Sequence, residues 1–211
     1  MIFKDRNEAG KLLAEKLKGY KKEKPIILAI PRGGVVIGSE IAKELNAELN
    51  VIILKKIGAP YNPELAIGSI CQDGSVFLNE EYIKELNVKE EYIKEEKKKL
   101  MEEINERKRR YWQGELKLKG KIVILVDDGI ATGATALIAI RFIKKQGAKK
   151  VILAVPISSI NAIDVLGKEA EVVCLYKPEL LMAIGQFYQN FEQVEDEEVM
   201  NILKEHRKRL K

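Results

Sequence analysis

Five short runs of consecutive apolar residues constrain the fold of this chain more than any other feature. They are spaced along the 211 residues at Pro25–Ile30, Val51–Leu54, Ile122–Val126, Val151–Val155 and Val172–Leu175. A strand that is apolar at every position has both faces buried, as in a parallel sheet that helices cover on both sides. These runs therefore predict the strands of a parallel sheet.

Most of these runs are followed by a segment with helical periodicity. Val35–Leu45 carries apolar residues on one stripe, and Gly133–Lys145 shows the same pattern and ends before Gly147. Alternating strands and helices are typical of doubly wound α/β folds. We therefore predict an α/β fold with a mostly parallel five-stranded sheet.

One long segment, about 57–120, does not follow this alternation. It begins with a turn-rich stretch, continues through an expected hairpin at Gln72–Ser75, and enters a long charged helix at Glu90–Tyr111. Only a thin apolar seam runs along that helix, so most of its surface has to stay in water. We interpret the segment as a hairpin and long-helix arm or hood, inserted into a single domain spanning residues 1–211.

The C-terminal tail from Lys177 is the second addition to the sheet. It ends in a predicted helix whose first turn is acidic and whose last turn is basic, as the helix dipole favours. The single histidine, His206, falls on the apolar stripe of this helix, so we expect it to be structural.

The composition narrows the class of protein. No apolar run approaches the roughly 20 residues needed to span a bilayer, and the charged N-terminus lacks a signal-peptide pattern. We expect a soluble cytoplasmic protein without membrane contacts. The formal charge of +5 suits anionic ligands, although surplus surface charge would give the same sign. The abundance of Lys and Glu resembles the bias of hyperthermophile proteins.

The most informative segment follows the run Ile122–Val126. Asp127 and Asp128 come at the carboxyl edge of the predicted sheet, where ligands bind in such folds. The small or hydroxylated residues Gly129–Thr135 come next and precede a helix, whose start presents unpaired amides with positive dipole character. The segment has neither the Walker nor the dinucleotide-binding pattern. We interpret it as a phosphate-binding loop with two carboxylates on its rim.

Two carboxylates would repel a phosphate that they faced, so they require hydroxyl groups or a cation such as Mg²⁺. A ribose 5-phosphate meets both needs, with its 2- and 3-hydroxyls on Asp127 and Asp128. The string Val126–Thr135 resembles the 5-phosphoribosyl 1-pyrophosphate (PRPP) signature of the type I phosphoribosyltransferases. In this interpretation the 5-phosphate is bound by Ala131, Thr132, Gly133, Ala134 and Thr135.

Two further segments resemble parts of the same family. Pro31–Gly34 occupies the place of the family's pyrophosphate loop, with amides at Gly33 and Gly34 and a guanidinium at Arg32. A tight turn with a surface arginine would have the same sequence. Lys55–Lys56 resembles the basic pair of adenine-type members, and a solvated lysine pair is the alternative. Lys55 stands where relatives often have arginine, and it lacks the bidentate geometry of arginine.

Other motifs along the chain resemble predicted phosphoribosyltransferases whose acceptor is undefined. They are Asp5–Arg6 with Ala9–Gly10, Lys56–Pro60 with Asn62–Gly68, and Gly185–Tyr188. The resemblance implies the fold and the phosphoribosyl ligand but no acceptor. Glu64 and Gln186 are candidates for acceptor recognition. Phe187, Tyr188 and Phe191 would either stack on a base or pack in the core.

The leading hypothesis is a transferase that uses PRPP and Mg²⁺ to add a 5-phosphoribosyl group to a nitrogenous base, purine or pyrimidine. Arg32, Lys55 and Lys56 would stabilise the departing pyrophosphate, and Asp127 and Asp128 would contact the metal indirectly. We expect a homodimer.

Two alternatives use the same ligand site. One is a sensor of PRPP or nucleotides, with the basic run Arg107–Trp112 contacting nucleic acid. The other is a hydrolase, with water as the acceptor. Because such basic runs are more often solvated helix faces, we do not expect a nucleic-acid partner.

Overall fold

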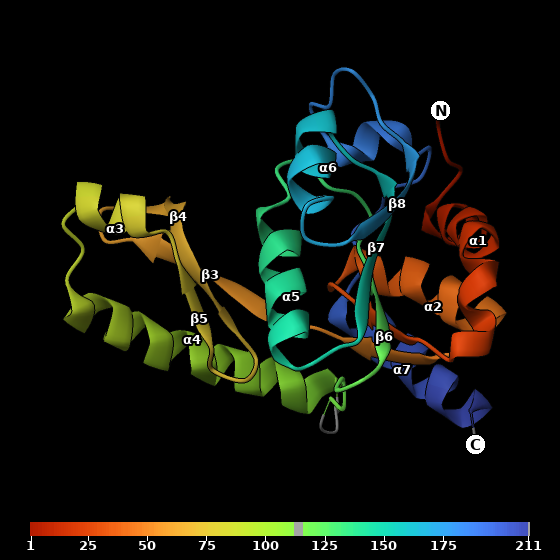
Figure 1. The fold of residues 1–211 in the computed structure, drawn as a ribbon, viewed down its shortest axis with the longest axis horizontal. Coiled ribbons are helices and arrows are strands. Elements are labelled where there is room, and N and C mark those ends of the chain that lie inside the picture. Colours follow the sequence, from red (N-terminus) through yellow and green to blue (C-terminus); the bar gives the residue numbers. More distant parts are fainter. Residues whose placement is uncertain (112–115, 211) are drawn as a thin grey trace. The chain divides into compact units, whose positions relative to one another are not determined.

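The structure is a computed structural model that describes residues 1–111 and 116–210 (Figure 1). The chain forms two compact units, one of Met1–Val51 with Gly114–Lys211 and the other of Ile52–Gln113. In the described residues the first unit contains a five-stranded sheet and the second a three-stranded sheet. The single domain with an inserted arm stays a prediction.

The five-stranded sheet of the first unit is parallel throughout. Its strands follow the order β2, β1, β6, β7, β8, and each neighbouring pair is parallel. They are β2 (Glu48–Val51), β1 (Ile26–Ala29), β6 (Ile122–Val126), β7 (Lys150–Ile157) and β8 (Glu171–Tyr176). All residues of the central strand β6 are buried, because helices cover both faces. The predicted α/β class and five-stranded sheet are confirmed.

Helices lie on both faces of this sheet (Figure 1). One face carries α1 (Arg6–Leu17), α2 (Gly33–Leu45) and α7 (Asp196–Arg209), and the other carries α5 (Ala134–Lys145) and α6 (Ile160–Leu166). Nine of the 13 residues of α2 are buried, because this helix contacts the sheet, α1 and α7. The short helices η1 (Lys18–Glu23) and η2 (Ile184–Phe187) lie before β1 and in the tail.

One strand of the sheet differs from its predicted position. The apolar run Val51–Leu54 is not a strand of the sheet: β2 ends at Val51, and Leu54 already begins β3 of the second unit. The reason is that β2 lies at the sheet edge and alternates between exposed and buried positions, so it has no continuous apolar run. Ile52 and Ile53 are buried outside any strand, and the Ile53 amide donates to Oε1 of Gln72 at 2.9 Å.

The second unit is an antiparallel sheet with two helices. Its strands are β3 (Leu54–Ala59), β4 (Asn62–Cys71) and β5 (Val76–Leu78), and its helices are α3 (Glu80–Glu85) and α4 (Glu90–Tyr111). The predicted hairpin at Gln72–Ser75 joins β4 to β5, and the long helix has its predicted bounds. Leu100, Ile104 and Tyr111 are its buried residues, which confirms the thin apolar seam.

The tail helix α7 also matches its prediction, with acidic residues in its first turn and basic residues in its last. His206 is 5% exposed, and its Nε2 lies 2.8 Å from the carbonyl oxygen of Ala47. This contact is structural, as expected. Among the described helices, none has both the length and the apolar character needed to cross a membrane.

Candidate active site

The two adjacent carboxylates lie where the central strand of the sheet ends. Strand β6 places Asp127 and Asp128 at its carboxyl end, and both are half-buried. The Asp128 amide donates to Oδ1 of Asp127 at 2.8 Å. Neighbouring parallel strands end at the same edge, so the loops after β1 and β7 are next to this pair.

The loop after the carboxylates runs to the start of α5 and is tied to the next strand. The Ile130 amide donates to the carbonyl of Ile157 at 2.9 Å, and the Ser159 hydroxyl donates to the carbonyl of Ala131 at 2.6 Å. Gly133 caps α5 with a φ of 80°, which a glycine adopts without strain. Ala131, Thr132, Ala134 and Thr135 are exposed. The loop is therefore exposed next to the first amides of α5, and anion binding by these residues stays a prediction.

The loop after β1 packs directly against the carboxylates. A Cβ atom at Gly33 would lie 1.9 Å from Oδ2 of Asp128, and one at Gly34 would lie 2.8 Å from the carbonyl oxygen of Val126. Both positions therefore require glycine. The Pro31–Arg32 peptide bond in this loop is cis.

Arg32 is paired with the first turn of α7. Its Nη1 lies 3.2 Å from Oε2 of Glu195 and 4.0 Å from Oδ1 of Asp196. About a third of the Arg32 side chain is exposed, at 34%. The guanidinium is thus at the site edge but held by acidic residues of the chain itself.

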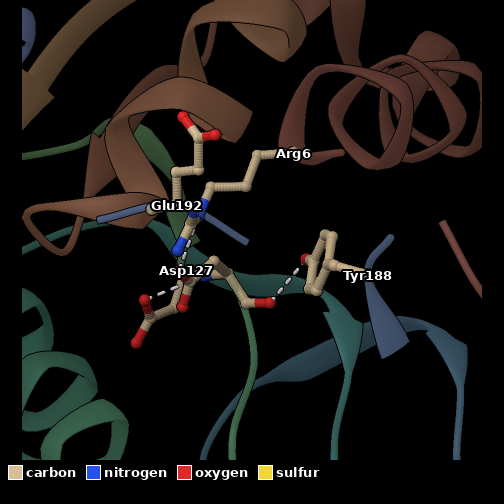
Figure 2. Close-up of polar contacts among 5 residues, drawn as sticks. Arg6, Asp127, Tyr188 and Glu192 are labelled. Atoms are coloured by element: carbon tan, nitrogen blue, oxygen red, sulfur yellow. Dashed lines mark hydrogen bonds and ion pairs between the residues drawn. The ribbon is translucent and has the colours of Figure 1, made fainter. Parts of the chain in front are cut away.

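Arg6 and Tyr188, both labelled in Figure 2, contact Asp128, although the sequence did not assign them to it. Nε of Arg6 lies 2.8 Å from Oδ2 of Asp128, and the Tyr188 hydroxyl donates to the Asp128 carbonyl at 2.7 Å. Tyr188 is 6% exposed, so of its two expected roles, core packing applies and stacking on a base does not. In the sequence, only the family-like motifs Asp5–Arg6 and Gly185–Tyr188 pointed to these two residues, and they did not indicate a contact with Asp128.

Burial controls the charge of this cluster. It raises the pKa of Asp127 well above the usual value, and the neighbouring charge of Asp128 raises it further. Burial also raises the pKa of Tyr188, so its hydroxyl stays protonated as a donor. The ionised form of Asp127 is therefore disfavoured in the folded protein.

Comparison with known proteins agrees with this geometry. The sequence profile of the phosphoribosyl transferase domain matches residues 4–173. The chain belongs to this family. The match includes α1, the loop after β1 and the carboxylates after β6, whereas Tyr188 lies beyond the matched residues.

Individual relatives support the assignment. Provisionally named phosphoribosyl transferases from two strains of Mycobacterium tuberculosis are 40% identical over 205 residues, or 96% of this chain and 46% of theirs. The chain thus spans about half the length of these curated relatives. The crystal structure of TT1426 from Thermus thermophilus is 39% identical with a TM-score of 0.86, covering 97% of this chain and 99% of that one. An adenine phosphoribosyltransferase of Mycoplasmopsis agalactiae is 40% identical over 62 residues, 28% of this chain and 36% of its own length.

Three of the residues that the sequence predicts to bind substrate lie in the second unit. Lys55 and Lys56 belong to β3 rather than following a strand of the large sheet, which corrects their expected location. Nζ of Lys55 lies 2.7 Å from Oε2 of Glu103, and Nζ of Lys56 lies 2.8 Å from Oε2 of Glu64. The hydrogen bond from Lys56 lowers the pKa of Glu64. The roles of Lys55, Lys56 and Glu64 stay predictions.

Gln186, the other acceptor candidate, lies in the first unit. It is exposed on η2, two residues after Ile184, whose side chain covers Gly129 of the phosphate loop. Gln186 is thus on a segment that contacts the loop after β6.

The basic run of α4 was the basis of the sensor alternative. Lys108 donates to the carbonyl of Gln72 at 3.4 Å, and Arg110 pairs with Glu106. Trp112, the last residue of that run, lies outside the described residues. The contacts of Lys108 and Arg110 fit a solvated, internally paired helix face.

Asp127 and Asp128 are the residues that fit a divalent cation. Within residues 1–111 and 116–210, no group of three or more His, Cys, Asp or Glu side chains is placed to hold a metal. A carboxylate pair suits Mg²⁺ when substrate oxygens and water complete its coordination. The donor set therefore fits a cation that arrives with a phosphorylated ligand.

Proposed function

We propose that this domain transfers a 5-phosphoribosyl group from PRPP to a nitrogenous base, purine or pyrimidine, with release of pyrophosphate. One observation carries the proposal: the carboxylate pair, the phosphate loop and the glycines after β1 meet at one sheet edge. PRPP carries a phosphate, a diol and a pyrophosphate, and these three elements match its three parts.

Each part of the donor has a proposed partner. The loop Ala131–Thr135 and the amides at the start of α5 bind the 5-phosphate. Asp127 and Asp128 accept hydrogen bonds from the ribose hydroxyls. The amides of Gly33 and Gly34, with Arg32, bind the pyrophosphate.

The reaction requires positioning and charge stabilisation more than a nucleophile. Bond cleavage at the anomeric carbon places positive charge on the ribose and negative charge on pyrophosphate. Arg32 would neutralise the leaving group after releasing Glu195, and Lys55 and Lys56 are proposed to stabilise the same charge. Mg²⁺, when bound, supplies further charge neutralisation on the pyrophosphate. Glu64 and Gln186 are the proposed acceptor contacts.

A turnover assay tests this function. The protein is incubated with Mg²⁺, PRPP and a panel of purine and pyrimidine bases, while pyrophosphate and nucleotide are quantified. We expect pyrophosphate release that depends on one base or a few. Pyrophosphate release without base would instead identify a hydrolase, and tight PRPP binding without turnover would identify a sensor.

The carboxylate pair provides the matched variants. The double variant Asp127→Asn, Asp128→Asn is expected to lose PRPP binding while keeping the fold, because the amides are weaker acceptors for the diol and cation. Asp164→Asn is the control, since Asp164 is exposed on α6. Unchanged PRPP affinity in the double variant, measured by calorimetry, would contradict the assignment.

The assembly is a further proposal. We expect a homodimer, which light scattering coupled to gel filtration would measure directly. A monomeric mass at micromolar concentration would contradict this expectation.

A further inference from the structure

Asp128 is held on both its side chain and its main chain. Nε of Arg6 contacts Oδ2 at 2.8 Å, and the Tyr188 hydroxyl donates to the carbonyl at 2.7 Å. The side chains of Arg6 and Asp128 are only 11% and 18% exposed. Solvent therefore screens this ion pair much less than the exposed pairs on the surface.

The guanidinium of Arg6 is itself fixed by three contacts. Besides Asp128, Nη1 donates to the carbonyl of Glu192 at 2.8 Å, and the guanidinium carbon lies 3.8 Å from the centroid of the Phe191 ring. Phe191 in turn stacks on Tyr188, with ring centroids 4.9 Å apart. A planar group with donors in separate directions suits this arrangement, and a lysine does not.

The chain segments that carry Arg6 and Tyr188 are joined to each other. The Phe3 amide donates to the carbonyl of Phe187 at 2.8 Å, and the Gln189 amide donates to the carbonyl of Phe3 at 2.8 Å. The Asn190 amide donates to the carbonyl of Lys4 at 2.9 Å. The start of the chain and the tail thus form one support that contacts Asp128.

We propose that Arg6 is a positioning residue for ribose binding, which fixes the Asp128 carboxylate so that one oxygen is presented to the ribose hydroxyls. This proposal rests on the proposed function of the site. Oδ2 is occupied by Arg6, while Oδ1 of Asp128 accepts no hydrogen bond from the described residues. A carboxylate fixed before binding does not have to be ordered by the ligand, so Arg6 increases PRPP affinity through Asp128.

PRPP affinity tests the positioning role. Arg6→Gln, Arg6→Lys and the control Arg141→Gln are compared by calorimetry with PRPP and Mg²⁺. Arg141 is half exposed on α5 and pairs with Glu169 at 3.5 Å, so its variant loses an ion pair away from the site. We expect about ten-fold weaker binding for Arg6→Gln, partial recovery in Arg6→Lys, and wild-type affinity in the control.

The ligand-free crystal structure of Arg6→Gln separates this proposal from the proposed function. If wild-type protein does not bind PRPP, the proposed function fails, while the position of the Asp128 carboxylate in the ligand-free variant still tests Arg6. An Asp128 carboxylate that leaves its wild-type rotamer in Arg6→Gln, but not in Arg141→Gln, supports the proposal. A folded Arg6→Gln variant with the Asp128 carboxylate in its wild-type position and wild-type PRPP affinity overturns it. If that variant does not fold, Arg6→Lys decides: equality with wild type in PRPP affinity overturns the proposal.

Discussion

Gly33 lies at the most crowded point of the site, between Asp128 and Arg6. A Cβ atom there would be 1.9 Å from Oδ2 of Asp128 and 2.7 Å from Nε of Arg6. Gly33→Ala would therefore displace the carboxylate, and we expect PRPP affinity to fall about ten-fold or more, as measured by calorimetry. Gly19→Ala is the control, because a Cβ atom at Gly19 meets nothing within 4 Å. Equal affinities in the two variants would contradict this account of the site.

Asp127 is expected to reduce the stability of the free protein at neutral pH. Its pKa is raised in the folded state, so the folded state binds more protons than the unfolded state between the two pKa values. Stability is therefore lost as pH rises from the unfolded to the folded pKa, and the loss persists above it. Asp127→Asn avoids this loss and still accepts the Asp128 amide.

Thermal unfolding as a function of pH measures this effect. We expect Asp127→Asn to melt at a higher temperature than wild type at pH 7 and to lose that advantage under acidic conditions. A variant that melts below wild type at pH 7 would show that the ionised Asp127 is stabilised by its surroundings.

The individual residues differed in how readily the sequence revealed them. Asp127, Asp128, Gly33 and Gly34 follow buried strands, so strand prediction alone placed them at one sheet edge. Arg6 contacts Asp128 across 122 positions in the sequence, and Tyr188 contacts it across 60. Local patterns contain no information on such pairings, which depend on how the tail packs.

At the scale of elements, the acidic start of helix α7 restrains the loop after β1 through Arg32. The negative charges of Glu195 and Asp196 are stabilised by the positive end of the helix dipole, and both side chains also contact Arg32. Because the ligand has to compete with Glu195 for Arg32, we expect Glu195→Gln to bind pyrophosphate more tightly. Exposed ion pairs contribute up to about 1 kcal/mol, so the gain should be at most about five-fold.

Glu197→Gln is the matched control for that prediction. Glu197 lies in the first turn of α7, two residues after the N-cap Glu195, and is exposed, so its replacement changes the net charge equally. Calorimetric titration with pyrophosphate and Mg²⁺ distinguishes the two variants. A similar gain in both would indicate a general charge effect rather than release of Arg32.

Elements with strong periodicity were the most predictable. The helix Glu90–Tyr111 and the strand Ile122–Val126 have their predicted bounds, because long amphipathic and continuous apolar patterns are unambiguous. Strand β2 was displaced because an edge strand alternates, and the apolar residues Ile52 and Ile53 are buried outside any strand. The apolar run therefore predicted correctly that Ile52 and Ile53 are buried, but it did not predict which residues pair with the neighbouring strand.

At the scale of the whole molecule, the sequence predicted the class of fold but not how the candidate residues divide between units. Lys55, Lys56 and Glu64 belong to the second unit, whereas Gln186 and the loops after β1 and β6 belong to the first. The alternation of strands and helices determines the parallel sheet. Ligands bind at the carboxyl edge of a parallel sheet, but no comparable rule predicts where a ligand would bind on the antiparallel sheet of the second unit.

The thermal stability of the whole chain should respond separately to the two halves of PRPP. A ligand that binds only the folded state stabilises it by about 2.7 kcal/mol at 100 times its Kd. With Mg²⁺ present, we expect ribose 5-phosphate and pyrophosphate each to raise the melting temperature by several degrees. Asp127→Asn with Asp128→Asn should lose the response to ribose 5-phosphate and keep the response to pyrophosphate, because the glycines after β1 are unchanged.

The net charge of the chain makes a control necessary for this measurement. A formal charge of +5 attracts any polyanion, so sulfate at matched ionic strength has to be tested alongside both ligands. Specific binding predicts that sulfate raises the melting temperature less than either ligand does and acts equally on wild type and the double variant. If the double variant lost both responses together, the two loops would not act as separate parts of the donor site. If it kept both, the carboxylates would have no part in ribose binding.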